Sequence, residues 1–116
     1  MTTLALRDRL NDIVSYGSEA IEAVGNLSAD QILAERFREH TVLRTVQIVG
    51  EAAAQLIKLD PAMSERIPDL RRAIQLRNVL VHGYTKIRMD EIVLIVRTDM
   101  PGLVSRAADI LGEQDT

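Results

Sequence analysis

Apolar residues recur every three or four positions along most of the chain, which is the spacing of one face of an α-helix. The first such series predicts an amphipathic helix over residues 4–24, and Gly25 directly after it is a plausible helix stop. Ser28 and Gln31 have the spacing of a capping box, in which each side chain binds a free backbone amide of the other residue. A short second helix is therefore expected after Ser28.

The longest apolar stripe predicts a central helix over residues 38–59. The stripe consists of Val42, Val46, Val49, Ala53 and Leu56. Gly50 lies within it, and glycine lowers the stability of a helix by itself. Its presence therefore predicts that another backbone approaches closely at this point. Asp60 and Pro61 are expected to end the helix.

Two prolines divide the next part of the chain. Pro61 and Pro68 bracket a short turn-like segment, and Pro68 is expected at the first position of a helix over residues 69–82. Gly83 is expected to break that helix. Residues 92–96 have strand-like propensity, but no second strand-like segment exists to pair with them, so residues 89–97 are predicted to form a buried helix.

A last helix is expected after Asp99, Met100 and Pro101, which resemble an N-cap and a first turn. Its apolar positions are Leu103, Val104, Ala107 and Leu111. The pattern as a whole predicts an all-α protein, an antiparallel up-and-down bundle of five to six helices in a single domain over residues 1–116.

The amino-acid composition limits the number of domains and the kinds of functional site that the chain can form. With 116 residues, 47% hydrophobic and 27% charged, the chain fits one globular domain with one core. It has no cysteine, which excludes disulfides, thiolate metal sites and a thiol nucleophile. Charged residues come too early for a signal-peptide core, and no apolar run approaches the roughly 20 residues of a membrane span. We expect a cytoplasmic protein without a membrane partner.

Charge is unevenly distributed along the chain. The net charge is −3, which argues against a protein that coats nucleic acid by bulk attraction. Residues 66–88 nevertheless hold six basic residues against one acid, a net +5, so the remainder is −8. Such a cluster can mark a site for an anionic ligand, or it can reflect basic side chains that gather near helix ends and solvated faces.

Arg77 stands out within this basic segment. On a helical wheel at about 100° per residue, it falls inside the apolar arc of residues 69–82. A guanidinium there needs a carboxylate, a phosphate or a partner subunit, and an ion pair with Glu51 or another acid is one explanation. Asn78 and His82 are four residues apart and can be neighbours. His82 could simply cap free carbonyls, and Tyr84 could be a core or rim residue.

The stretch from Arg77 through His82 to Tyr84 resembles the Arg-x4-His-x-Tyr signature of the HEPN superfamily, specifically its HepT-like branch. Two further blocks resemble that family in the same order. One is Ile-Val-Gly-Glu-Ala-Ala at residues 48–53, and the other is Asp-Met-Pro-Gly-Leu at residues 99–103. Together the three blocks cover roughly residues 35–111, which makes the resemblance more specific than the short motif alone.

The resemblance implies a metal-independent ribonuclease without a cofactor, commonly the toxin of a toxin–antitoxin pair. It also implies a homodimer in which Arg77 and His82 of both subunits line one cleft. RNA cleavage by the substrate's own 2′-hydroxyl needs a proton carrier and a cation that holds the phosphate. Histidine ordinarily has a pKa near neutral, so His82 suits the first role, and the fork of Arg77 suits the second. RNA, not DNA, is the expected substrate.

Other positions receive roles by the same resemblance. Glu51 could orient Arg77 or a water molecule, with Asn78 in support, although a solvated glutamate is nearly as good an explanation. Tyr84 matches the tyrosine that a partner minimal nucleotidyltransferase, the antitoxin, adenylylates. Gly83 and Asp69 depart from common family residues, and this departure bears on how that partner is recognised. His40 has no clear role.

Two other classes of function fit the same residues. The chain could be a non-catalytic helical dimer that binds nucleotide or RNA and a nucleotidyltransferase. It could also be a purely structural dimer in which the arrangement of Arg77 and His82 is coincidental. If the protein cleaves RNA and the variant His82→Ala does not, the ribonuclease hypothesis is favoured over both the non-catalytic binding dimer and the structural dimer.

Overall fold

The structure, a computed structural model, describes residues 3–81 and 86–114, and the described part is helical without strands. The helices are α1 (Leu4–Val24), α2 (Ala29–Leu33), α3 (Arg36–Leu59), α4 (Met63–Arg66), α5 (Leu70–Val81), α6 (Lys86–Thr98) and α7 (Met100–Gln114). This confirms the predicted all-α class. The seventh helix, beyond the five to six expected, is the single turn α4.

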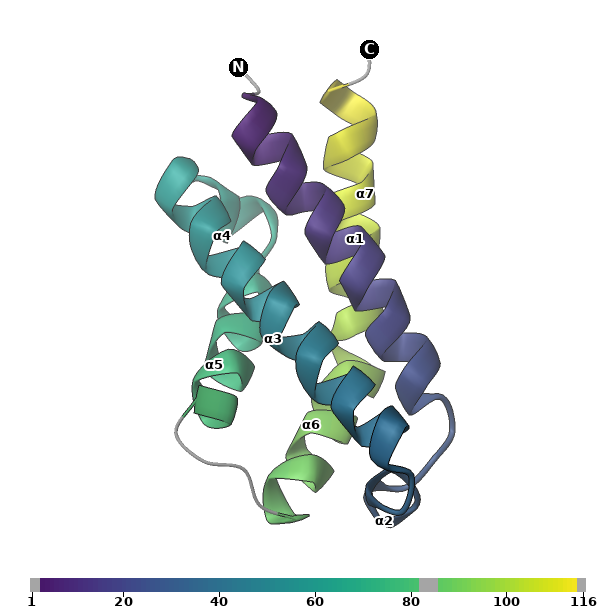
Figure 1. Cartoon of the computed structure of the whole chain (residues 1–116). Coiled ribbons are helices and arrows are strands. Elements are labelled where there is room, and N and C mark those ends of the chain that lie inside the picture. The colour runs from purple at the N-terminus through teal and green to yellow at the C-terminus, as the bar shows by residue number, and fades with distance from the viewer. Residues whose placement is uncertain (1–2, 82–85, 115–116) are drawn as a thin grey trace.

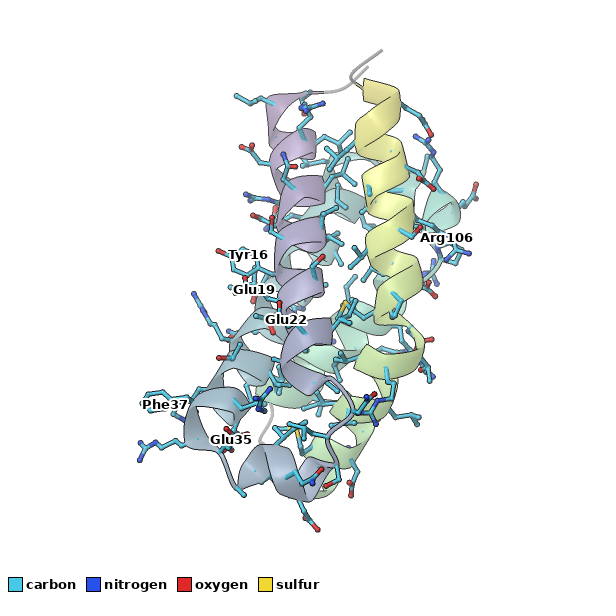
Figure 2. The ribbon with its side chains drawn as sticks, turned by 90° about the vertical axis from the view of Figure 1, so that its right-hand side faces the viewer. Tyr16, Glu19, Glu22, Glu35, Phe37 and Arg106 are labelled. Atoms are coloured by element: carbon cyan, nitrogen blue, oxygen red, sulfur yellow. The ribbon has the colours of Figure 1, made fainter. Side chains whose placement is uncertain are left out.

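The long helices α1, α3 and α5 alternate in direction, whereas α6 and α7 follow one another in the same direction, and all pack around one core (Figure 1). The central helix α3 packs against α1 on one side and α5 on the other, and α7 packs along α1. In Figures 1 and 2, α1 and α7 run side by side, with both ends of the chain at one end of the bundle. The predicted stripe of α3 is buried throughout, and it forms the middle of the core.

Local signals in the sequence explain where the first helices begin and end. The hydroxyl of Thr3 accepts a hydrogen bond from the Leu6 amide at 3.1 Å, which caps α1. Gly25 ends α1 with φ of 48°, a conformation that favours glycine. The predicted capping box is present: the Gln31 amide donates to Ser28 Oγ at 3.2 Å, and the Ser28 amide donates to Gln31 Oε1 at 2.9 Å.

The segment between the two prolines differs from the prediction. It was expected to be turn-like, but it forms the helical turn α4, which is anchored by the buried Met63 at its start and the buried Ile67 directly after its end. Pro68 is not the first residue of a helix, because α5 begins at Leu70. The Leu70 amide donates to the Ile67 carbonyl at 3.1 Å, so Pro68 lies inside a tight turn. The fixed φ of proline suits that turn position.

The strand-like run is helical, as predicted. Met89, Ile92 and Val96 are 0% exposed, so α6 buries one face while Leu94 on another face is 61% exposed. α7 begins directly after Asp99, whose carbonyl accepts from the Leu103 amide at 3.2 Å. The predicted end of the α5 segment near His82 and Gly83 lies outside the described residues.

Candidate active site

Arg77 lies where α5 makes its closest approach to α3. A methyl group built on Gly50 would overlap Cβ of Arg77 and would lie 2.8 Å from the carbonyl oxygen of Ala73. The absence of a side chain on Gly50 is therefore what lets the two helices meet at this level. This confirms the close approach expected from a glycine within the apolar stripe, and it fixes the base of the Arg77 side chain.

The guanidinium of Arg77 contacts two of the predicted supporting residues. Its Nε and Nη2 donate to Asn78 Oδ1 at 3.2 and 2.9 Å, and its Nη1 lies 3.8 Å from Glu51 Oε1. The Arg77 side chain is 25% exposed, whereas that of Glu51 is 53% exposed. The ion pair expected with Glu51 is thus present, but it is long and open to solvent, so it contributes little to stability.

The structure therefore brings Arg77, Asn78 and Glu51 together. The other two predicted site residues, His82 and Tyr84, lie outside the described residues. His40 is exposed and lies 11 residues before Glu51 on the same helix, roughly 16 Å along its axis. It is therefore not part of this group.

The basic segment is largely balanced by acids from elsewhere in the fold. Arg66 lies 2.6 Å from Glu113 of α7, and Arg72 lies 3.4 Å from Asp99. Arg88 pairs with Glu91 at 3.3 Å. Asp69, the one acid of the segment, instead binds Arg106 of α7 at 3.0 Å, and Figure 2 labels that arginine. Arg66, Arg72 and Arg88 thus each have an acid beside them, Arg77 has its long contact to Glu51, and Arg71 is exposed on the surface.

Two surface grooves lie along α3. One, here the Arg44 groove, has a volume of about 340 Å³ and is lined by Arg9, Asp12, Arg44, Gln47, Ile48, Glu51, Ala52 and Gln55. It adjoins the candidate site because Glu51 belongs to both. Sequence reasoning missed it, although the spacing of residues 44, 47, 48, 51 and 55 places them on one face of a helix.

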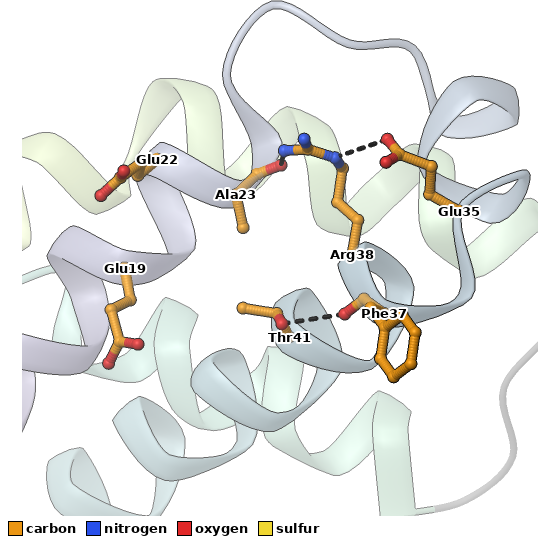
Figure 3. A pocket seen from close by; sticks show the side chains of 7 residues that line it. All are labelled: Glu19, Glu22, Ala23, Glu35, Phe37, Arg38 and Thr41. Carbon is orange, nitrogen blue, oxygen red and sulfur yellow. Dashed lines mark hydrogen bonds and ion pairs between the residues drawn. The ribbon is translucent and has the colours of Figure 1, made fainter.

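The other groove, here the Phe37 groove, has a volume of about 400 Å³ and lies between α1 and the start of α3 (Figure 3). Arg38 is held there by Glu35 at 2.8 Å and by the Ala23 carbonyl at 2.9 Å. Glu19 and Glu22 also line the groove, so its lining is acidic. A groove of this charge repels phosphate, and it does not suit RNA.

The described residues were also considered for metal-binding groups and for membrane-spanning helices. They contain no group of three or more histidine, aspartate or glutamate side chains placed to hold a metal ion. None of the helices in the described ranges is long and apolar enough to cross a membrane.

Comparison with known proteins adds to this geometry. The family described as Ribonuclease HepT-like matches residues 13–110, which include Gly50, Glu51, Arg77 and His82. A protein of Methanocaldococcus jannaschii named "Putative RNase MJ1380" is 26% identical over 94 residues, covering 79% of this chain and 84% of that protein. No solved structure matches the chain. The family match covers most of the chain, so the protein belongs to the HepT-like ribonuclease family and is a ribonuclease by enzyme class.

Proposed function

We propose that this ribonuclease cleaves RNA without a metal ion, with Arg77 and His82 acting together in the cleft of a homodimer. The observation that carries the proposal is the guanidinium of Arg77, which is partly exposed and held at its base by the contact between α3 and α5. A cation fixed in this way can meet a phosphate without a large cost in side-chain ordering.

The reaction assigns a distinct task to each residue. The 2′-oxygen of a ribose attacks the adjacent phosphorus, and the bond from phosphorus to the 5′-oxygen of the next nucleotide breaks. One imidazole takes the proton of the 2′-hydroxyl, and a protonated imidazole gives a proton to the leaving 5′-oxygen. Arg77 stabilises the added negative charge on the phosphate, which a planar fork of donors can do with two hydrogen bonds.

Dimerisation follows from the count of histidines. Each chain has one histidine in the motif, so a separate acid and base require a second copy of His82. A dimer seam along the exposed edge of α5 beside Arg77, next to the face that packs on α3, would bring the two motifs together. A strictly monomeric protein that is fully active at micromolar concentration would contradict this part of the proposal.

Control at Tyr84 completes the proposal. We place the protein in the cytoplasm as the toxin of a pair whose antitoxin is a minimal nucleotidyltransferase. Adenylylation of Tyr84, two residues after His82, would add a bulky negative group beside the proton carrier. That group would repel the RNA phosphate, and so would silence the enzyme.

The direct test is cleavage of RNA by the purified protein in the presence of a chelator. We expect activity in the wild type and none in His82→Ala or Arg77→Ala. Arg71→Ala is the matched control, because Arg71 is exposed on the same helix as Arg77. Full activity of His82→Ala would overturn the mechanism. Binding of RNA without any cleavage by the wild type would favour the non-catalytic dimer instead.

A further inference from the structure

The Arg44 groove adjoins the candidate site through Glu51. It is lined by residues of α1 and α3, and Figure 1 shows α3 between α1 and α5, the helix to which Arg77 belongs. Glu51 lines the groove and also lies 3.8 Å from Nη1 of Arg77. A ligand held by Arg77 could therefore continue into the groove past Glu51.

The groove offers hydrogen-bond donors that the fold does not use. Arg44 is exposed and has no ion pair or hydrogen bond to another described side chain. Arg9 lies 3.2 Å from Asp12 through Nη2, but its Nε is buried and lacks a hydrogen-bond partner in the described part of the chain. That enclosed Nε is not open to a ligand. Arg44, an exposed charged donor, is the group that favours a ligand with acceptor oxygens.

The rest of the lining suits a nucleotide. Ile48 is half-buried and Ala52 is buried, which gives the groove an apolar floor for a base or a ribose. Gln47 and Gln55 stand along the same face, and glutamine can donate to and accept from the edge of a base. The volume of about 340 Å³ lies within the usual range of ligand pockets.

We propose that the Arg44 groove is a second RNA subsite, which holds a nucleotide next to the one that Arg77 presents for cleavage. Arg44 binds the phosphate of that nucleotide, and the two glutamines contact its base. Arg44 lies seven residues before Glu51, roughly 10 Å along the helix axis, so the phosphate it binds is distinct from the scissile one. The inference rests on the proposed function, because it extends the path of the same RNA.

The test measures binding of a 2′-O-methyl oligoribonucleotide, which cannot be cleaved because its 2′-oxygens are blocked. We expect Arg44→Ala to weaken binding roughly tenfold, as for loss of one charge-assisted contact, and to reduce the salt dependence by about one ion. Arg36→Ala is the matched control, since Arg36 is an exposed arginine on the same helix outside the groove. Thermal melting establishes that both variants are folded.

Three outcomes would overturn the subsite. Equal losses in Arg44→Ala and Arg36→Ala would mean that only overall charge matters. Unchanged RNA binding in Arg44→Ala would mean that Arg44 does not contact the RNA. A weaker dimer with unchanged RNA binding would mean that a second copy of the chain covers the groove.

The same experiment keeps the two proposals apart. Binding of the blocked RNA does not require cleavage, so an active His82→Ala variant would sink the mechanism while leaving the subsite intact. If Arg44→Ala binds the blocked RNA normally and His82→Ala does not cleave RNA, the subsite is contradicted while the catalytic mechanism stands. A dinucleotide substrate carries only the scissile phosphate, so the loss of cleavage in Arg44→Ala is expected to be smaller on it than on longer RNA.

Discussion

Replacing Gly50 with alanine tests the contact that positions Arg77. The added methyl group would overlap Cβ of Arg77 and lie 2.8 Å from the Ala73 carbonyl oxygen. Both are close to the backbone of α5, so a rotation of a flexible side-chain end cannot relieve the overlap. We therefore expect α5 to move away from α3 at the level of the candidate site.

The expected cost comes from two opposing effects. Alanine favours a helix over glycine by about 0.8–1 kcal/mol. Overpacking of a tight contact costs about 1–3 kcal/mol, and here the contact is with backbone, which places the cost toward the upper end. The net effect is a loss of about 1–2 kcal/mol, or a melting temperature lower by roughly 4–8 °C for a domain of this size.

The rate of RNA cleavage should fall even where the Gly50→Ala variant is still folded. A misplacement of about 1 Å at a reacting group can cost 100-fold in rate, and Arg77 is the residue that the methyl group meets first. We expect kcat for RNA cleavage to fall by roughly tenfold to 100-fold at a temperature where circular dichroism shows the variant to be folded.

Two other glycines provide controls. Gly112 on α7 has nothing within 4 Å of an added methyl group, so Gly112→Ala should keep or slightly raise the melting temperature. Gly17→Ala would meet Val104 Cγ2 at 2.5 Å in the contact between α1 and α7, away from Arg77. It should lower stability while leaving kcat of the folded enzyme unchanged. A Gly50→Ala variant with wild-type stability and wild-type kcat would refute the reasoning.

Further predictions concern stability and substrate affinity. Ser28→Ala removes the hydroxyl that accepts from the Gln31 amide, and it should lower the free energy of unfolding by about 1 kcal/mol in urea titrations; no change would mean that the capping box is not formed in solution. Leu56→Ala empties a fully buried position of α3 and should cost about 2–5 kcal/mol in the same assay, so a cost under about 1 kcal/mol would contradict the packing of the core. Glu51→Gln removes a half-exposed negative charge near Arg77 and should lower KM for RNA by roughly threefold with little change in stability; a higher KM would mean that the carboxylate orients the guanidinium.

Most of the helices can be predicted from the sequence because their signals are local. The spacing of apolar residues, the capping box at Ser28 and the glycine at position 25 all act within a few residues of the helix that they define. The strand-like run in α6 could be assigned as helix because the chain offers no partner strand. The turn α4 was missed, because the burial of Met63 and Ile67 that anchors it depends on helices distant in the sequence.

Part of the candidate site could also be predicted from local signals in the sequence. Gly50 predicted a close approach, and Glu51 was one of the expected partners of Arg77. Both follow from residue type and from the periodicity of helices. The spacing from Arg77 to His82 pointed to RNA chemistry through a resemblance, and the family match supports that class of activity.

What the tertiary structure decided is which distant residues share a surface. The sequence by itself determined where the helices form, which faces are apolar and which side chains are candidates for chemistry, because these depend on neighbours within about one or two turns. The pairs Arg66–Glu113, Asp69–Arg106 and Arg72–Asp99 join residues 47, 37 and 27 positions apart. Two of these pairs place a distant acid beside an arginine of the basic stretch, and no local pattern predicts which acid that is. The Arg44 groove likewise exists only because α1 packs beside α3, and no local pattern encodes that choice of neighbour.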